Sequence, residues 1–192
     1  STIIDIGCST GSLLCKMSDN QSGKKDLNFI GIEPQDKFCE VTTKKLNSRP
    51  QIINSTHTFK IEQCSVTDFE FIVSDMIISY YTIQFIKPRF RQIIFDNVFK
   101  SLNWGGAFLF FEKIRAQDAR FQDLLTSIYF EYKRNNGFSN DEILEKFFSL
   151  KGAMEPYTSS ANRDYLSRAG FSDMLTIYKN IFTNHVNIYA WP

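Results

Sequence analysis

Short apolar runs alternate with longer amphipathic stretches from the first residues of the chain to Lys113. Runs of this length suit strands buried in a sheet, whereas the stretches between them repeat apolar residues at the spacing of a helix. The expected strands are Thr2–Ile6, Asn28–Ile32, Thr58–Gln63, Asp75–Tyr81 and Ala107–Lys113. The expected helices are Ser12–Met17, Asp36–Leu46 and Pro88–Leu102, and Asn103–Gly106 has the composition of a turn.

The remainder of the chain is mostly helical and then returns to strands. Its expected helices are Gln117–Arg134, Asn140–Leu150 and Ser159–Ala169, with stop signals at Gly137 and Gly170. The last expected strands are Phe171–Tyr178 and Asn184–Trp191. Because only the short segment Lys179–Thr183 joins them, we expect an antiparallel pair.

Strands that alternate with helices predict an α/β protein with a doubly wound sheet. We expect seven strands, mostly parallel, with the antiparallel C-terminal hairpin at the edge of the sheet. The length fits a single domain, 1–192, in which the helices of about residues 115–157 form a lid insertion. Because the chain opens in a core strand, we expect further sequence before Ser1.

The composition, with 43% hydrophobic and 22% charged residues, is that of a soluble globular protein. A net charge of +1 does not indicate a nucleic-acid partner, and no apolar run reaches the roughly 20 residues of a membrane helix. Four cysteines stand apart without metal-ligand spacing, so we expect no metal site. Reduced thiols of this kind favour a cytoplasmic protein.

The segment Asp5–Gly11, Asp-Ile-Gly-Cys-Ser-Thr-Gly, ends the first expected strand and begins the first expected helix. Glycines there allow a tight turn and a close approach to a ligand, and the helix N-terminus offers free N–H groups. A dinucleotide site would want glycine at positions 7, 9 and 12, but Ser9 and Ser12 occupy two of them. An acidic residue before a small-residue loop that closes on glycine, here Asp5, Gly7 and Gly11, instead favours S-adenosyl-L-methionine as the cofactor.

The second expected strand ends in a carboxylate that supports the same cofactor. Glu33 follows the loop by about 20 residues, where a ribose-binding acid belongs. It can accept hydrogen bonds from both ribose hydroxyls, although a carboxylate at a helix N-terminus also stabilises the helix dipole. With this site, the order of elements predicts the methyltransferase-type Rossmann fold.

Two further segments follow from the expected geometry. The loop after the third strand should cover the adenine, with Ser65 and Val66 offering a polar edge and an apolar wall. The end of the fourth strand should face the methionine part of the cofactor. Tyr80 and Tyr81 can wall a sulfonium ion by cation–π contact there, or pack as ordinary core aromatics.

At this level of detail the chain resembles the carboxy-S-adenosylmethionine synthases and related small methyltransferases of tRNA wobble-uridine modification. The resemblance extends over nearly the whole chain and is carried by Asp5–Gly11, by Tyr81–Phe85 followed by Pro88, and above all by Phe130–Ser139. It implies an S-adenosylmethionine-dependent class I methyltransferase. The cofactor contacts that it implies are Gly7, Cys8, Ser9, Glu33, Pro34, Ser65, Val66 and Tyr80.

Three departures from that family affect the expected reaction. Ser65 stands where the family has an aspartate, and Tyr80 stands where it has an asparagine. Phe147 aligns with the arginine that pairs with the extra carboxylate of carboxy-S-adenosylmethionine. Because a buried carboxylate without a cationic partner is strongly disfavoured, Phe147 argues for ordinary S-adenosylmethionine.

We therefore expect an enzyme that transfers a methyl group to a small-molecule or carrier-bound acceptor, in a protein for which a homodimer is one option. The alternatives are a carboxy-S-adenosylmethionine synthase and an inactive cofactor-binding partner protein. The sequence identifies no catalytic base. The candidates on the substrate side are Tyr81, Arg115, Tyr132, Arg134 and Phe147, although the cations among them are equally typical of solvated helix surfaces.

Overall fold

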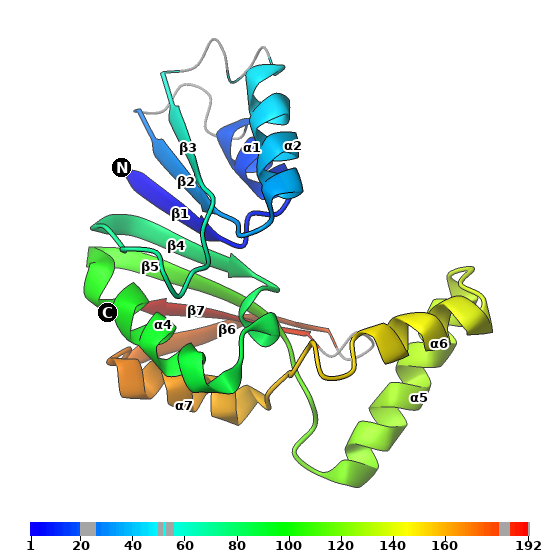
Figure 1. The fold of residues 1–192 in the computed structure, drawn as a ribbon. Coiled ribbons are helices and arrows are strands. Elements are labelled where there is room, and N and C mark those ends of the chain that lie inside the picture. The colour runs from blue at the N-terminus through cyan, green and yellow to red at the C-terminus, as the bar shows by residue number, and fades with distance from the viewer. Residues whose placement is uncertain (20–25, 50–51, 53–55, 181–184, 192) are drawn as a thin grey trace.

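The computed structural model describes residues 1–19, 26–49, 52, 56–180 and 185–191. The expected α/β class, with a parallel sheet and helices against it, is confirmed (Figure 1). The strands are β1 (Thr2–Ile6), β2 (Asn28–Ile32), β3 (Thr58–Glu62), β4 (Ser74–Tyr80), β5 (Leu102–Lys113), β6 (Asp173–Asn180) and β7 (His185–Trp191). The helices are α1 (Ser12–Asp19), α2 (Asp36–Asn47), η1 (Ile83–Phe85), α4 (Pro88–Ser101), α5 (Ala119–Asn135), α6 (Asn140–Ser149) and α7 (Ser159–Ala169).

The strands follow the order β3-β2-β1-β4-β5-β7-β6 across the sheet. The pairs from β3 to β5 are parallel, while β7 pairs antiparallel with β5 and β6 pairs antiparallel with β7. The chain winds outward from β1 in one direction and from β4 in the other. In open α/β sheets, such a switch point places a crevice outside the carboxyl ends of the strands.

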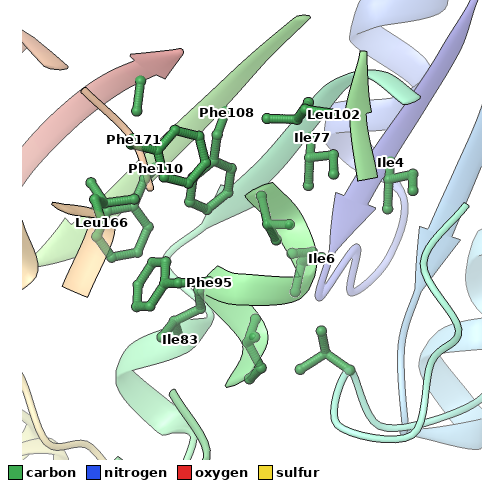
Figure 2. Packing of buried hydrophobic residues seen from close by; sticks show 14 of the residues in the cluster. Ile4, Ile6, Ile77, Ile83, Phe95, Leu102, Phe108, Phe110, Leu166 and Phe171 are labelled. Carbon is green, nitrogen blue, oxygen red and sulfur yellow. The ribbon is translucent and has the colours of Figure 1, made fainter. Parts of the chain in front are cut away.

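The main core lies between the sheet and helices α4 and α7. Phe95 of α4 meets Phe110 of β5 with ring centroids 5.2 Å apart, and Phe108 stacks on Phe171 at 6.0 Å (Figure 2). Leu166 of α7 is fully buried in the same cluster. Smaller clusters on the opposite face pack α1 and α2 against the sheet. Apolar side chains therefore hold both faces and leave the carboxyl ends of the strands for a ligand.

Helices α5 and α6 extend beyond the end of the sheet, as Figure 1 shows in yellow-green and yellow. Helix α5 has no buried residue, and Ile143 is the buried residue of α6. The two ends of this insertion meet where the Arg115 N–H donates to the Tyr157 carbonyl at 3.1 Å. None of the described helices has the length and apolar character to cross a membrane.

Most expected boundaries agree with the structure to within two residues, but the turn at Asn103–Gly106 is wrong. These residues belong to β5, where they form a bulge opposite Asp75 of β4. Trp104 points outward, 94% exposed, and Gly105 has a φ of +77°. Contact with β4 therefore extends the strand through residues whose own preference is to turn. The connection expected at Lys179–Thr183 falls largely outside the described residues.

Candidate functional site

A cavity of about 760 Å³ opens at the carboxyl ends of β1, β2 and β4, where the switch point of the sheet lies. Seven of the expected cofactor residues line it, together with Tyr81 of the substrate-side set. These lining residues are Gly7, Ser9, Glu33, Pro34, Ser65, Val66, Tyr80 and Tyr81. The structure thus brings residues from four separate segments of the chain to one hollow.

The loop after β1 is shaped by its glycines. Gly7 has a φ of +72°, and its N–H donates to the Ile32 carbonyl at 2.8 Å. A Cβ at this position would lie 2.3 Å from Oγ1 of Thr82, so no larger residue fits without a shift. Ser9 adopts a φ of +50° although it is not glycine. The loop therefore sits in a left-handed conformation that brings its backbone directly to the cavity.

Glu33 joins this loop to the end of β2. The side chain is 6% exposed, and its two oxygens accept hydrogen bonds from the backbone N–H groups of Ser9, at 3.0 Å, and Gln35, at 2.9 Å. Each carboxylate oxygen keeps a further lone pair for a ligand. Glu33 and Lys87 are the charged residues among those described along this cavity.

Asp5, Cys8 and Gly11 are buried around the loop and do not line the cavity. Burial, reinforced by the charge of Glu33, raises the pKa of Asp5 to about 7, and neither of its oxygens has a hydrogen-bond partner. Burial likewise raises the pKa of the Cys8 thiol, which therefore stays protonated at neutral pH. Gly11 lies against Thr42 of α2.

The end of β4 carries an aromatic group at the cavity. Tyr80 is 51% exposed, and its ring lies 4.6 Å from that of Tyr81 and 5.1 Å from that of Phe111. Tyr81 turns the chain away from the strand with a φ of +58°, and its N–H donates to the Phe111 carbonyl at 2.9 Å. Burial raises the pKa of Tyr81 to about 12, so its hydroxyl stays protonated at neutral pH.

Several cavity residues were not among the sequence candidates. They are Ile6, Ile32, Gln35, Phe38, Thr67, Thr82, Phe85, Ile86, Lys87 and Phe90. Phe38, Phe85 and Phe90 are each more than a third exposed, which is unusual for large aromatic side chains on a core-facing element. The signal available in the sequence was that Phe38 and Phe85 shortly follow Pro34 and Thr82, which stand in loops at the ends of strands.

The other substrate-side candidates lie outside this cavity. Arg115 lines a second hollow of about 600 Å³, and Phe147 lines a third of about 320 Å³. Tyr132 and Arg134 lie on α5, exposed and away from the residues that line the first cavity. Among the described residues, no group of three or more histidine, cysteine, aspartate or glutamate side chains is arranged to hold a metal ion.

The residues around the first cavity fit an adenosyl group with a cationic tail. The backbone of the loop after β1 reaches the cavity at Gly7 and Ser9, a buried carboxylate stands at the wall, and much of the apolar part of the wall is aromatic. Carboxylates suit ribose hydroxyls, and aromatic faces suit a positively charged sulfur.

Relatives of the chain point in the same direction. The methyltransferase domain family matches residues 4–108. The carboxy-S-adenosyl-L-methionine synthase of Staphylococcus epidermidis is 34% identical over 188 residues, which cover 98% of this chain and 77% of that protein. Its namesake in Campylobacter lari is 30% identical over 177 residues, which cover 92% of this chain and 72% of the relative.

The fold is also that of solved methyltransferases. Human N-acetylserotonin methyltransferase in complex with S-adenosylmethionine aligns with 99% of this chain at a TM-score of 0.62 and 14% identity. The chain spans about half of that protein, 47% of its length. The methyltransferase-domain match and the relatives named above indicate S-adenosyl-L-methionine as the cofactor. The chain belongs to the S-adenosylmethionine-dependent methyltransferase-domain family, in the group that contains the carboxy-S-adenosyl-L-methionine synthases.

Proposed function

We propose that the 760 Å³ cavity holds S-adenosyl-L-methionine and that the protein transfers its methyl group to a small-molecule or carrier-bound acceptor. The observation that carries this proposal is Glu33, a buried carboxylate fixed by the cofactor loop at the wall of the cavity. In this arrangement Glu33 accepts hydrogen bonds from the ribose hydroxyls. Ser65 and Val66 lie where the adenine binds, and Tyr80 faces the sulfonium.

When bound, S-adenosylmethionine supplies a methyl group on a positively charged sulfur. The leaving group is a neutral thioether, so its departure needs no acid. The protein therefore contributes mainly position and exclusion of water. The rings of Tyr80 and Tyr81 form the wall at the methyl end, and Phe111 packs against Tyr80. Phe85 and Phe90 add apolar surface to the same cavity. An acceptor with an apolar face suits this end of the cavity.

A second candidate reaction is the formation of carboxy-S-adenosyl-L-methionine. The observation in its favour is the 34% identity to the Staphylococcus epidermidis enzyme of that name over nearly the whole chain. Against it stands Phe147, in place of the arginine of the family that the sequence resembles. Phe147 also lines a different cavity from Glu33.

Mass spectrometry of the small molecule released on denaturation of the purified protein separates these reactions. S-adenosylmethionine or S-adenosylhomocysteine supports methyl transfer. A ligand heavier by one carboxyl group overturns the first candidate in favour of the second. If no ligand is released, titration with S-adenosylmethionine by calorimetry decides, because failure to bind contradicts both reactions.

We further propose the cytoplasm as the compartment and a homodimer as the assembly. All four cysteines are free thiols, three of them buried, which suits a reducing compartment. Large apolar side chains are exposed along α5 and α6, among them Phe121, Leu124 and Phe148. Burying such faces against a second copy would remove them from water. Light scattering during size-exclusion chromatography tests the assembly.

A further inference from the structure

A separate cavity of about 320 Å³ lies where helices α5 and α6 and the segment after α6 meet the end of β5. It contains none of the residues assigned above to the cofactor. Apolar and aromatic groups form much of its wall, including Tyr129, Phe130, Phe147, Leu150 and Met154. Four lysines complete the lining, namely Lys113, Lys133, Lys146 and Lys151.

The charged side chains that line this cavity are all positive among the described residues. No aspartate or glutamate is among its described lining residues. None of the four ammonium groups forms an ion pair within the part of the chain that the structure describes. Most lysines on protein surfaces are fully solvated, but Lys113 and Lys133 are both half-buried. A positive hollow without a counter-charge among its described lining residues therefore lies between the helical insertion and the end of β5.

Two of these ammonium groups lie close to the ring of Tyr129. The Nζ atom of Lys113 lies 4.6 Å from the centre of the Tyr129 ring, and that of Lys133 lies 4.5 Å from the same centre. The ring face offsets part of the lost hydration of each ammonium group, but it does not offset their mutual repulsion. Burial, with the charge of Lys133 added to it, lowers the pKa of Lys113. An anion between the two ammonium groups would relieve both costs.

We infer that this cavity is a binding site for a small organic anion, whose carboxylate or phosphate group lies between Lys113 and Lys133 and whose apolar part packs against Phe130, Phe147 and Met154. Ammonium groups bind either anion as point charges. The apolar wall selects anions that carry a ring or a short hydrocarbon body over inorganic ions. This site goes beyond the proposed methyl transfer and needs no cofactor to be bound.

The test is calorimetric titration of the purified protein, without S-adenosylmethionine and at low ionic strength, with benzoate, phenyl phosphate and the uncharged benzyl alcohol. We expect at least one of the two anions to bind and the alcohol to bind at least tenfold more weakly than it. Lys113→Gln and Lys133→Gln should each weaken binding of the anion severalfold, whereas Lys16→Gln, which changes an exposed lysine of α1, should not. Comparison of benzoate with phenyl phosphate tells a carboxylate site from a phosphate site.

Thermal unfolding without ligand shows that each variant is folded, and removal of a repelling charge should not lower its midpoint. Binding of the alcohol as tightly as the anions, binding of neither anion, or equal losses in Lys133→Gln and Lys16→Gln would each overturn the proposal. Titration of the same variants with S-adenosylmethionine separates this result from the proposed function, because loss of cofactor binding there would concern the other cavity.

Discussion

The Glu33 carboxylate accepts a hydrogen bond from the Ser9 N–H at 3.0 Å, and this bond ties the end of β2 to the loop after β1. Ser9 holds a left-handed φ of +50°, which an L-residue other than glycine rarely adopts. The carboxylate therefore fixes the loop in place before any ligand arrives. Such preorganisation removes part of the ordering cost of binding.

We expect Glu33→Gln to weaken S-adenosylmethionine binding about 10- to 100-fold, because hydrogen bonds to a charged group contribute about 1.5–3 kcal/mol. The amide can accept from only one of the two backbone N–H groups that now donate to Glu33, so its NH2 end would face the other. Calorimetry measures the dissociation constant. The matched control is Glu40→Gln on the exposed face of α2, which should bind as the parent does. Unchanged binding in Glu33→Gln would remove this residue from the cofactor site.

Gly7→Ala should destabilise the protein far more than Gly137→Ala. Both glycines have a positive φ, +72° and +89°, so each alanine carries about 1–2 kcal/mol of left-handed strain. Only at Gly7 does a Cβ meet a neighbour, Thr82, whereas nothing lies within 4 Å of a Cβ at Gly137. Urea unfolding measures the difference. Adding Thr82→Ala should recover part of the Gly7→Ala loss, and no recovery would mean that the clash is not the cause.

Tyr80→Leu should reduce the preference for S-adenosylmethionine over S-adenosylhomocysteine by about two- to fivefold, while Tyr80→Phe should retain it. Only the first ligand carries a sulfonium charge, and a cation over an exposed ring gains about 0.5–1 kcal/mol. The ring of Tyr80 is 51% exposed at the cavity and keeps its place against Phe111. Dissociation constants for the two ligands give the ratio. An equal loss of affinity for both ligands would mean that Tyr80 contributes apolar contact but no cation–π interaction.

Local patterns were enough to predict the strands of the sheet and the turn from β1 into α1. The strand Asn28–Ile32 and the helix Ser159–Ala169 have the bounds that their apolar spacing and flanking residues indicate. Gly170 ends α7 with a φ of +117°, a conformation that glycine adopts without strain. The bulge at Asn103–Gly106 was missed because its cause is not local. The Asn103 side chain donates to Oδ1 of Asp75 at 2.9 Å, a contact between strands that no sequence window contains.

The substrate side could not be predicted in the same way. Arg115 and Phe147 were chosen because they fall in the insertion, but sequence spacing does not say where an inserted helix pair points. The structure places both in cavities other than that of Glu33. Phe85 and Phe90, which do line the cavity of Glu33, stand among core residues in the sequence, because Ile83 and Ile94 close to them are buried. Periodicity alone cannot separate a core face from a cavity wall.

A buried carboxyl group on β5 should make stability depend on pH. Glu112 is 2% exposed, and its Oε1 has no hydrogen-bond partner. Burial raises the pKa of Glu112 to about 8, although the nearby Arg91 and the N–H groups of Ile83 and Gln84 act in the opposite direction. In the unfolded chain a glutamate ionises near its ordinary value of 4.5.

Between these two values the folded state keeps a proton that the unfolded chain has released, so the free energy of unfolding falls as pH rises. The slope from Glu112 approaches about 1.4 kcal/mol per pH unit. Glu112→Gln removes this contribution, and the variant should therefore gain stability relative to the parent between about pH 5 and about pH 8. Urea unfolding across that range measures the difference, with the exposed Glu145→Gln as control. Parallel pH profiles for parent and Glu112→Gln would mean that Glu112 is ionised in the folded protein and that its charge is compensated by Arg91.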